Sequence, residues 1–353
     1  MTFLAALQRA TTRFALGLAL VPLAGGAVSV ADEVAAPASP PPFTLEEGRG
    51  HPLVGKIWSP VSASFVEPAD VSRAVAKARF VLLGETHDNP DHHALQAHLV
   101  GEATKREEGD ARTPSVVLEM LTRDLQPKVS AFMAEGGTAP GFGPAVGWAS
   151  LGWPDFAMYR PIIAAALKAG LPIVAGDTPR AERREVARKG ISALGTERAM
   201  ALGLDQSLGA TAEGEMLDTL EQGHCGLMPR ESLTPLVLVQ RLRDATLAHA
   251  MIEADRQAGQ GAILIAGSGH VRRDLGAPWY LASRAPDLSS GGQTISVAFI
   301  EVREGENEPQ AYAGLGAGAP ARFDFVWFTP RAARGDPCEG LKERFEKQGA
   351  GKG

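Results

Sequence analysis

Two histidines at the same spacing from a glycine are the clearest candidates for chemistry in this sequence. The motifs "GETH" (84–87) and "GSGH" (267–270) each follow a short apolar run, and Glu119 ends a third run. Carboxylate and imidazole groups can bind a divalent ion that keeps a position open for water, or can act as general acid and base. The candidate metal ligands and catalytic groups of such a hydrolase are Glu85, His87, Glu119 and His270.

A predicted helix over residues 90–104 brings two more histidines close to the first motif. Asn89 is its expected N-cap and Pro90 its first residue. His92 and His93 fall in the first turn, where the partial positive charge of the helix N-terminus disfavours imidazolium. They are expected to stay neutral and available as ligands or donors, unless this is an ordinary solvated helix start.

A second predicted helix, over residues 232–257, carries three polar residues on one face. Gln240, Arg243 and Asp244 are spaced at i, i+3 and i+4. They could form a buried network, the wall of a ligand site or a salt-bridged solvent face. The apolar residues on both sides favour the buried network.

Alternating strands and helices must position these groups. Six apolar runs are continuous rather than alternating, which is typical of strands in a sheet covered on both faces. The sequence therefore predicts an α/β fold, with a mostly parallel central sheet flanked by helices and with helical insertions. The predicted strands are 79–84, 115–119, 171–176, 262–267, 295–302 and 323–328.

The carboxyl ends of parallel strands open on one edge of a sheet, where α/β folds place their ligands. Asp177 and Arg180 follow the predicted strand 171–176, so they are expected to join the two motifs at this edge. A lone histidine is more often a satisfied core residue, and that interpretation is preferred for His51, His98 and His249.

An aromatic patch surrounds Tyr159 in "WASLGWPDFAMYRP" (148–161). Trp148, Trp153 and Phe156 could line a flat apolar ligand site, and the phenol could reach a metal. Without further evidence, the same residues would be interpreted as part of the hydrophobic core.

The composition is that of a folded chain, because 44% of its 353 residues are hydrophobic and 22% are charged. A formal charge of −6 and a pI near 5.8 give no basic excess, so nucleic-acid binding is not expected. One domain is predicted over 51–335, followed by a C-terminal tail over 336–353. The glycine-rich stretches 136–147 and 313–320 are expected to be loops.

The first 31 residues have the layout of a cleavable secretory signal. Arg9 and Arg13 precede an apolar run, and Ser29 and Ala31 supply the small residues expected before a cleavage site. Residues 1–31 are therefore the predicted signal peptide, and residues 32–50 read as a flexible lead-in.

Cys225 and Cys338 are the only cysteines. In an oxidising compartment two thiols pair more often than they stay free, so a disulfide is predicted. The alternative is two buried free thiols, and a zinc site has little support because the chain has no CxxC motif.

Together these residues carry a family resemblance over about residues 80–332. The chain resembles ChaN-like haem-binding proteins, within a superfamily that also holds TIKI-type proteases, TraB-like proteins and erythromycin esterases. The stretches that carry the resemblance are "LLGETHDNPDHHALQ", "VVLEM", "WPDFAMYRP", "GDTPRAERR", "GHCGLMP", "QRLRDATLA", "GSGHVRRDLGAP" and "FVWFTPRA".

The resemblance implies haem binding in the bacterial envelope, as part of haem or iron uptake, with homodimers and an envelope receptor or transporter as partners. It implies a tyrosine ligand for haem iron, which is matched to Tyr159 with Tyr280 in reserve. The remaining implied haem-binding residues are His87, His92, His93, Arg180, His224 and His270. Many such proteins are lipoproteins, but no lipid-accepting cysteine is present here, so the expected location is the periplasm.

Two functions therefore compete. The first is a periplasmic haem-binding protein with tyrosine-ligated ferric haem and little or no catalysis. The second is a metal-dependent hydrolase of the protease or esterase type, built on the strand-end glutamates and the paired histidines. The first is preferred because the resemblance extends beyond the paired motifs. A purely structural role is disfavoured, because so many polar groups at one edge would be costly to desolvate.

Overall fold

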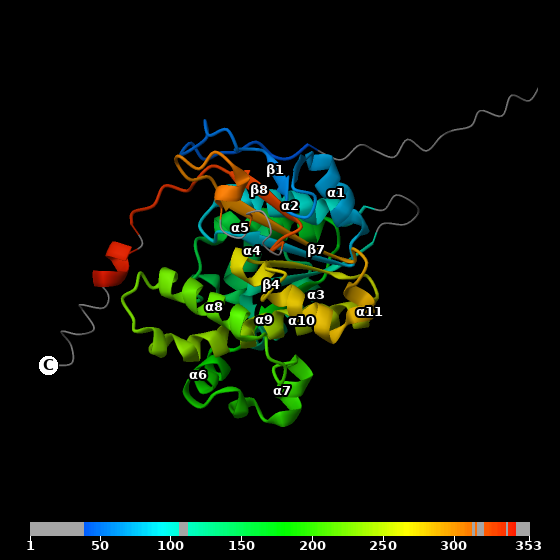
Figure 1. The fold of residues 1–353 in the computed structure, drawn as a ribbon. Helices are drawn as coiled ribbons and strands as arrows, with labels where there is room; N and C mark the ends of the chain where they lie inside the picture. The colour runs from blue at the N-terminus through cyan, green and yellow to red at the C-terminus, as the bar shows by residue number, and fades with distance from the viewer. Residues whose placement is uncertain (1–38, 106–111, 313–314, 316–320, 337, 344–353) are drawn as a thin grey trace, which may run out of the picture. The chain divides into compact units, whose positions relative to one another are not determined.

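An eight-stranded sheet runs through the middle of the computed structural model, which describes residues 39–105, 112–312, 315, 321–336 and 338–343 (Figure 1). The strand order is β2-β1-β8-β7-β3-β6-β4-β5. All pairs from β8 to β5 are parallel, and β1 is antiparallel to both β2 and β8. The predicted mostly parallel sheet is confirmed. The strands are β1 (Ile57–Ser59), β2 (Ser64–Val66), β3 (Phe80–Glu85), β4 (Ser115–Thr122), β5 (Ile173–Asp177), β6 (Ala262–Gly267), β7 (Thr294–Glu301) and β8 (Phe325–Thr329).

Helices cover both faces of this sheet. They are α1 (Pro68–Lys77), α2 (Pro90–Glu102), α3 (Gln126–Ala134), α4 (Ala139–Val146), α5 (Phe156–Lys168), α6 (Arg180–Lys189), α7 (Thr196–Leu202), α8 (Ala210–Gly223), α9 (Arg230–Ala258), α10 (Ala277–Arg284) and α11 (Pro286–Ser289). Short 3-10 turns are η1 (Arg123–Leu125), η2 (Trp148–Ser150), η3 (Ile191–Leu194), η4 (Ser268–Val271) and η5 (Pro309–Ala311).

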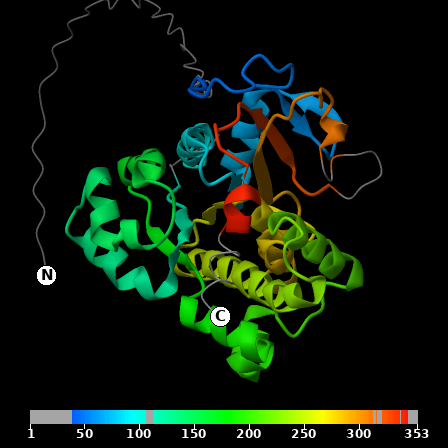
Figure 2. The same ribbon diagram turned by 90° about the vertical axis from the view of Figure 1, so that its left-hand side faces the viewer.

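Successive strand residues feed two separate cores, since neighbouring side chains of a strand point to opposite faces. Val81 and Leu83 pack with α1 to α5, whereas Phe80 and Leu82 pack with α9 and α10. The long helix α9 lies under the sheet, and the first strand β1 lies beside the last strand β8 (Figures 1 and 2). Burial on both faces explains why the strands read as continuous apolar runs.

The start of α2 agrees with its sequence signals. Asn89 caps the helix, because its side-chain oxygen accepts hydrogen bonds from the backbone of Asp91 and His92, at 3.0 and 3.2 Å. Pro90 is the first helical residue. This cap fixes the direction in which the chain leaves the first Gly-x-x-His motif.

The prediction of a loop over 136–147 is wrong, because α4 forms there. Phe142 and Val146 lie on the same side of this helix, and both are buried. Gly143 leaves room for the ring of Phe156, because a Cβ on Gly143 would lie 2.7 Å from that ring. Gly143 therefore serves close packing, and Gly147, with φ +74°, ends the helix. Most of the second predicted loop, 313–320, lies outside the described residues.

Both ends of the described chain are fastened to this fold. Thr44 donates to Asp91 in α2 from its backbone nitrogen and its hydroxyl, at 2.8 and 2.6 Å. The predicted pairing of Cys225 with Cys338 is confirmed, with 5.7 Å between the Cα atoms. The described residues form one compact unit. The predicted signal peptide lies outside the described residues, and within them no helix is long and apolar enough to cross a membrane.

Candidate functional site

The carboxyl ends of β3, β6, β4 and β5 lie next to one another and bring the strand-end groups together. Glu85 is the last residue of β3, Glu119 lies in β4 and Asp177 ends β5. His270 follows β6 in η4. Residues more than 180 positions apart thus share one polar cluster.

Glu85 is the hub of the first half of this cluster. Its Oε1 lies 2.8 Å from Nδ1 of His87 and accepts a hydrogen bond from the hydroxyl of Tyr159 at 3.0 Å. Its Oε2 lies 3.0 Å from Nε2 of His93, although these atoms are not aligned as a hydrogen bond. Burial opposes ionisation, but the two histidines lower the pKa of Glu85 to about 2. Glu85 is therefore a buried carboxylate at neutral pH.

Glu119 and Asp177 are held by one arginine. Arg243 of α9 donates to Glu119 Oε1 at 2.6 Å and to both oxygens of Asp177 at 2.9 to 3.1 Å. Glu119 Oε2 also accepts from the backbone nitrogen of Gly267 at 2.7 Å. Despite burial, His270 and Arg243 hold the pKa of Glu119 well below its ordinary value. The predicted buried network on α9 is therefore present.

His270 completes the second half of the cluster. Its Nδ1 lies 2.6 Å from Asp244 and 3.0 Å from the amide of Gln240, and its Nε2 lies 3.2 Å from Glu119. Burial disfavours the charged ring, but Glu119 and Asp244 outweigh it and raise the pKa of His270 to about 10. His270 is therefore charged at neutral pH, and both of its ring nitrogens already have carboxylate partners.

The two motif glycines are required for space. A Cβ on Gly84 would lie 2.4 Å from Val271 and 2.9 Å from the backbone of Ser268, and one on Gly267 would lie 3.0 Å from Nε2 of His87. Neither glycine has a positive φ. The two Gly-x-x-His motifs therefore pack directly against each other at the sheet edge.

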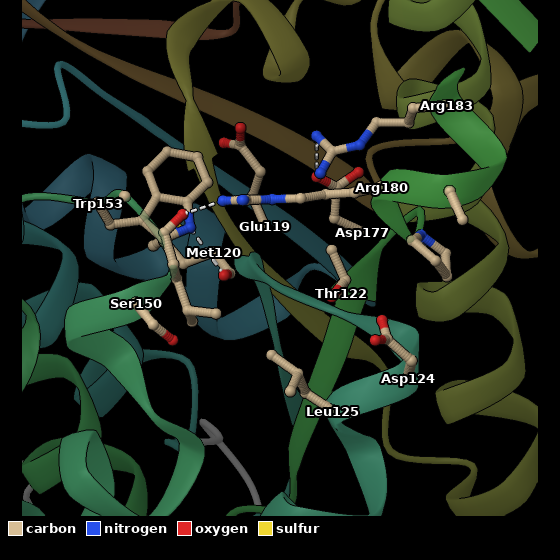
Figure 3. A pocket seen from close by; sticks show the side chains of 14 residues that line it. Glu119, Met120, Thr122, Asp124, Leu125, Ser150, Trp153, Asp177, Arg180 and Arg183 are labelled. Carbon is tan, nitrogen blue, oxygen red and sulfur yellow. Dashed lines mark hydrogen bonds and ion pairs between the residues drawn. The ribbon is translucent and has the colours of Figure 1, made fainter. Parts of the chain in front are cut away.

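Two cavities open beside this cluster. The His87 cavity, about 370 Å³, is lined by both Gly-x-x-His loops and by the apolar side chains of Met216, Leu220 and Leu275. The Trp153 cavity, about 520 Å³, is lined by Trp153 and by charged residues that include Arg180 (Figure 3).

Trp153 lines the Trp153 cavity and also contacts His87. Its ring meets the imidazole edge-on, with 4.8 Å between the centroids, and its Nε1 donates to Met120. The side chain of His87 keeps 35% of its surface exposed, whereas that of Glu85 has none. Burial would lower the pKa of His87, but the hydrogen bond to Glu85 and the charge of Glu119 raise it overall.

The remaining predicted haem-binding residues fall into different places. His92 is buried, with Nδ1 accepting from Thr86 and Nε2 bonded to Thr329, and burial lowers its pKa to about 3. It stays neutral, as predicted, but both of its nitrogens are occupied. His224 ends α8, where its Nδ1 lies 2.7 Å from the carbonyl oxygen of Leu220.

Neither candidate tyrosine is open to a cavity. Tyr159 is 2% exposed and Tyr280 is fully buried in the core on the α9 side, where Arg241 donates to its hydroxyl at 3.4 Å. Arg180 is exposed, and its guanidinium reaches the backbone of Leu151 across the Trp153 cavity (Figure 3). Tyr159 thus contacts Glu85. Arg180 lies elsewhere, in the lining of the Trp153 cavity.

The predicted four-residue metal set is not assembled in the described part of the chain. No group of three or more acidic, histidine or cysteine side chains there is arranged to hold a metal ion. The reason is that the candidate ligands already bond to one another and to an internal cation. Arg243 neutralises Glu119, and His270 is occupied by Asp244.

Several residues of the site were not predicted. Arg183 lines the Trp153 cavity, and its position three residues after Arg180 on the same helix could have revealed it. No sequence pattern predicted the apolar residues that line the His87 cavity. Met216 and Leu275 come from separate segments, and the sequence does not specify how these pack together.

Comparison with known proteins identifies the family of this chain. A family model described as haem-binding uptake, Tiki superfamily, ChaN matches residues 71–281. The chain belongs to this family. The resemblance carried by the sequence motifs is thereby confirmed. No match was found among curated proteins.

A solved structure resembles this ChaN-family chain in fold. The cofacial haem complex of ChaN from Campylobacter jejuni has a TM-score of 0.56 at 19% identity, covering 77% of this chain and 95% of that one. An erythromycin esterase variant in an open conformation has a TM-score of 0.34 at 14% identity, covering 79% and 84%.

Proposed function

We propose that this chain binds haem in the His87 cavity, as part of haem or iron uptake. The observation that carries the proposal is the half-buried imidazole of His87, which lines this cavity and whose Nδ1 is held by Glu85, while Nε2 lies 4.0 Å from Oε2 of Glu119. A carboxylate on one ring nitrogen is the usual arrangement behind a histidine that binds iron or zinc through the other. Membership of a haem-binding uptake family supports the same ligand.

The lining of the His87 cavity suits a porphyrin. Met216, Leu220 and Leu275 would contact the apolar ring, and His87 would hold the iron. Bound haem would supply a ferric centre with an exchangeable ligand position, which suits transfer between proteins. The Trp153 cavity is lined by charges of both signs, with Arg180 and Arg183 beside Glu119, Asp124 and Asp177, and suits an apolar ring less well.

A hemin titration tests this function. The wild-type chain should give a saturable Soret shift, and His87→Ala should change the spectrum and weaken binding at least roughly tenfold, by about 1.4 kcal/mol. His249→Ala is the matched control, because His249 bonds to Glu253 on α9, outside both cavities. A wild-type chain that produces no saturable shift would refute haem binding.

We further propose export by the predicted signal peptide, with residence in the periplasm and haem exchange with an envelope partner. The support is the sequence layout of residues 1–31 and the disulfide, which suits an oxidising compartment. N-terminal sequencing of exported protein should begin at Asp32.

Light scattering with and without hemin tests the proposed homodimer.

Hydrolysis is the second candidate, favoured by one observation. Glu85 and His87 form a carboxylate–imidazole pair beside a cavity that His87 lines, which is the arrangement of a general base. The base would act without the four-residue metal set. Ester or peptide turnover that disappears in His87→Ala would support it, and turnover that persists in this variant would exclude His87 as the base.

A further inference from the structure

Tyr159 lies behind the site and not in its cavity. Its ring packs against His93 and Trp148, with 4.1 and 4.8 Å between the centroids. Its hydroxyl donates to Glu85 Oε1 at 3.0 Å and lies 3.2 Å from the backbone carbonyl of His87. With 2% of its surface exposed, Tyr159 has no open side for a ligand.

The phenol also has a partner that opposes iron binding in this arrangement, because its hydroxyl lies against the Glu85 carboxylate. A phenolate here would face that carboxylate at hydrogen-bonding distance, and two like charges in a buried place repel strongly. The neutral phenol instead donates its proton to Glu85.

Glu85 in turn determines how His87 is oriented. A carboxylate can only accept hydrogen bonds, so the ring nitrogen 2.8 Å away, Nδ1, must carry a hydrogen. In the neutral ring this leaves Nε2 with its lone pair, 4.0 Å from Oε2 of Glu119, on a side chain that lines the His87 cavity. His93 lies against the other carboxylate oxygen and restricts its rotation.

We infer that Tyr159 is a positioning residue: its hydroxyl fixes the Glu85 carboxylate, which holds His87 in the Nδ1–H tautomer and presents Nε2 to the ligand. Tyr159 thus acts through two other side chains, without contact with the ligand. The haem part of this inference rests on the proposed function, whereas the tautomer part does not.

Nitrogen-15 NMR of the ligand-free chain tests the tautomer, at a pH above the pKa of His87. The wild type should show His87 predominantly as the Nδ1–H form. Tyr159→Phe, which removes one oxygen and keeps the ring, should shift His87 toward a mixture of tautomers. Tyr312→Phe is the matched control, since Tyr312 is equally buried but its hydroxyl accepts from the backbone of Arg303. An unchanged His87 signal in Tyr159→Phe would overturn the inference.

Hemin binding by the same variants separates a positioning residue from an iron ligand. Tyr159→Phe should keep the wild-type Soret position and bind hemin roughly tenfold more weakly, as expected for one lost hydrogen bond to a charged group. A Soret shift in Tyr159→Phe, with His87→Ala unchanged, would make Tyr159 the ligand and overturn the inference. If the wild type binds no hemin, the proposed function fails while the NMR result still decides the role of Tyr159.

Discussion

His270 is the residue whose charge holds the second half of the site together. It lies between Asp244 at 2.6 Å and Glu119 at 3.2 Å, and both carboxylates are buried. If the ring lost its proton, the buried charge of Asp244 would remain beside a neutral group. The charge of this imidazole is therefore coupled to the stability of the fold.

We expect the stability of the wild type to fall as the pH rises from about 6.5 to about 10, relative to His270→Gln. The folded pKa of about 10 lies above the unfolded value of 6.5, so the stabilisation is complete below pH 6.5 and is lost as the pH approaches 10. The difference should be on the order of a few kcal/mol. Urea unfolding of both proteins across this range measures it, and parallel pH profiles would contradict the prediction.

The sequence could predict which residues form the site better than how they pair. Glu85, His87, Glu119 and His270 follow from strand ends, because the sheet edge collects them whatever their rotamers. Their bonds depend on side chains that arrive from distant elements, such as Arg243, 124 positions from Glu119. The prediction of a metal site was wrong for this reason, because the guanidinium of Arg243 binds the Glu119 carboxylate that a metal ion would have needed.

At the scale of elements, β3 and η4 are in direct contact. Gly84 in β3 faces Ser268 and Val271, and this contact fixes the distance between the two Gly-x-x-His loops. A side chain at Gly84 would separate the strand from the turn that carries His270. The alignment of the paired motifs thus depends on one missing Cβ.

Gly84→Ala should destabilise the chain by roughly 1–3 kcal/mol, because its Cβ would lie 2.9 Å from backbone and 2.4 Å from Val271. Gly101→Ala provides the comparison. It lies in α2 with nothing within 4 Å of the new Cβ, and alanine favours helix by roughly 0.5–1 kcal/mol. Denaturant midpoints measure both, and equal midpoints would show that the β3–η4 contact can relax.

The strands could be predicted from sequence because burial on both faces leaves a continuous apolar run. The helix α4 could not, since glycine and proline usually mark loops. Its sequence, "APGFGPAV", forms a helix because Phe142 and Val146 gain burial and Gly143 admits the ring of Phe156. Tertiary packing outweighs local propensity there.

At the scale of the whole molecule, the C-terminal segment joins the two sides of the His87 cavity. Arg334 bonds to both carboxylate oxygens of Asp88, just after the first motif, and to both of Glu301. Four residues later Cys338 is joined to Cys225, directly after α8. Four residues span at most about 14 Å, so the disulfide limits how far this end of α8 can move from the sheet edge.

Replacing both cysteines by serine should lower the free energy of unfolding by up to roughly 4–5 kcal/mol. The cross-link closes a loop of 113 residues, and a loop of that length removes much chain entropy from the unfolded state. Guanidinium unfolding of the double variant, with the reduced wild type beside it, measures the loss. Equal stability of the oxidised wild type and the variant would contradict this account.

The same cross-link has a consequence for proteolysis. The covalent ring from Cys225 to Cys338 contains α9, β6, β7 and β8, and therefore the His270 half of the site. A protease that cuts once inside this ring opens it but releases no fragment, because the two pieces stay joined through sulfur. Nicked protein should migrate as separate pieces only after reduction, so the sheet edge can survive a break in its own backbone.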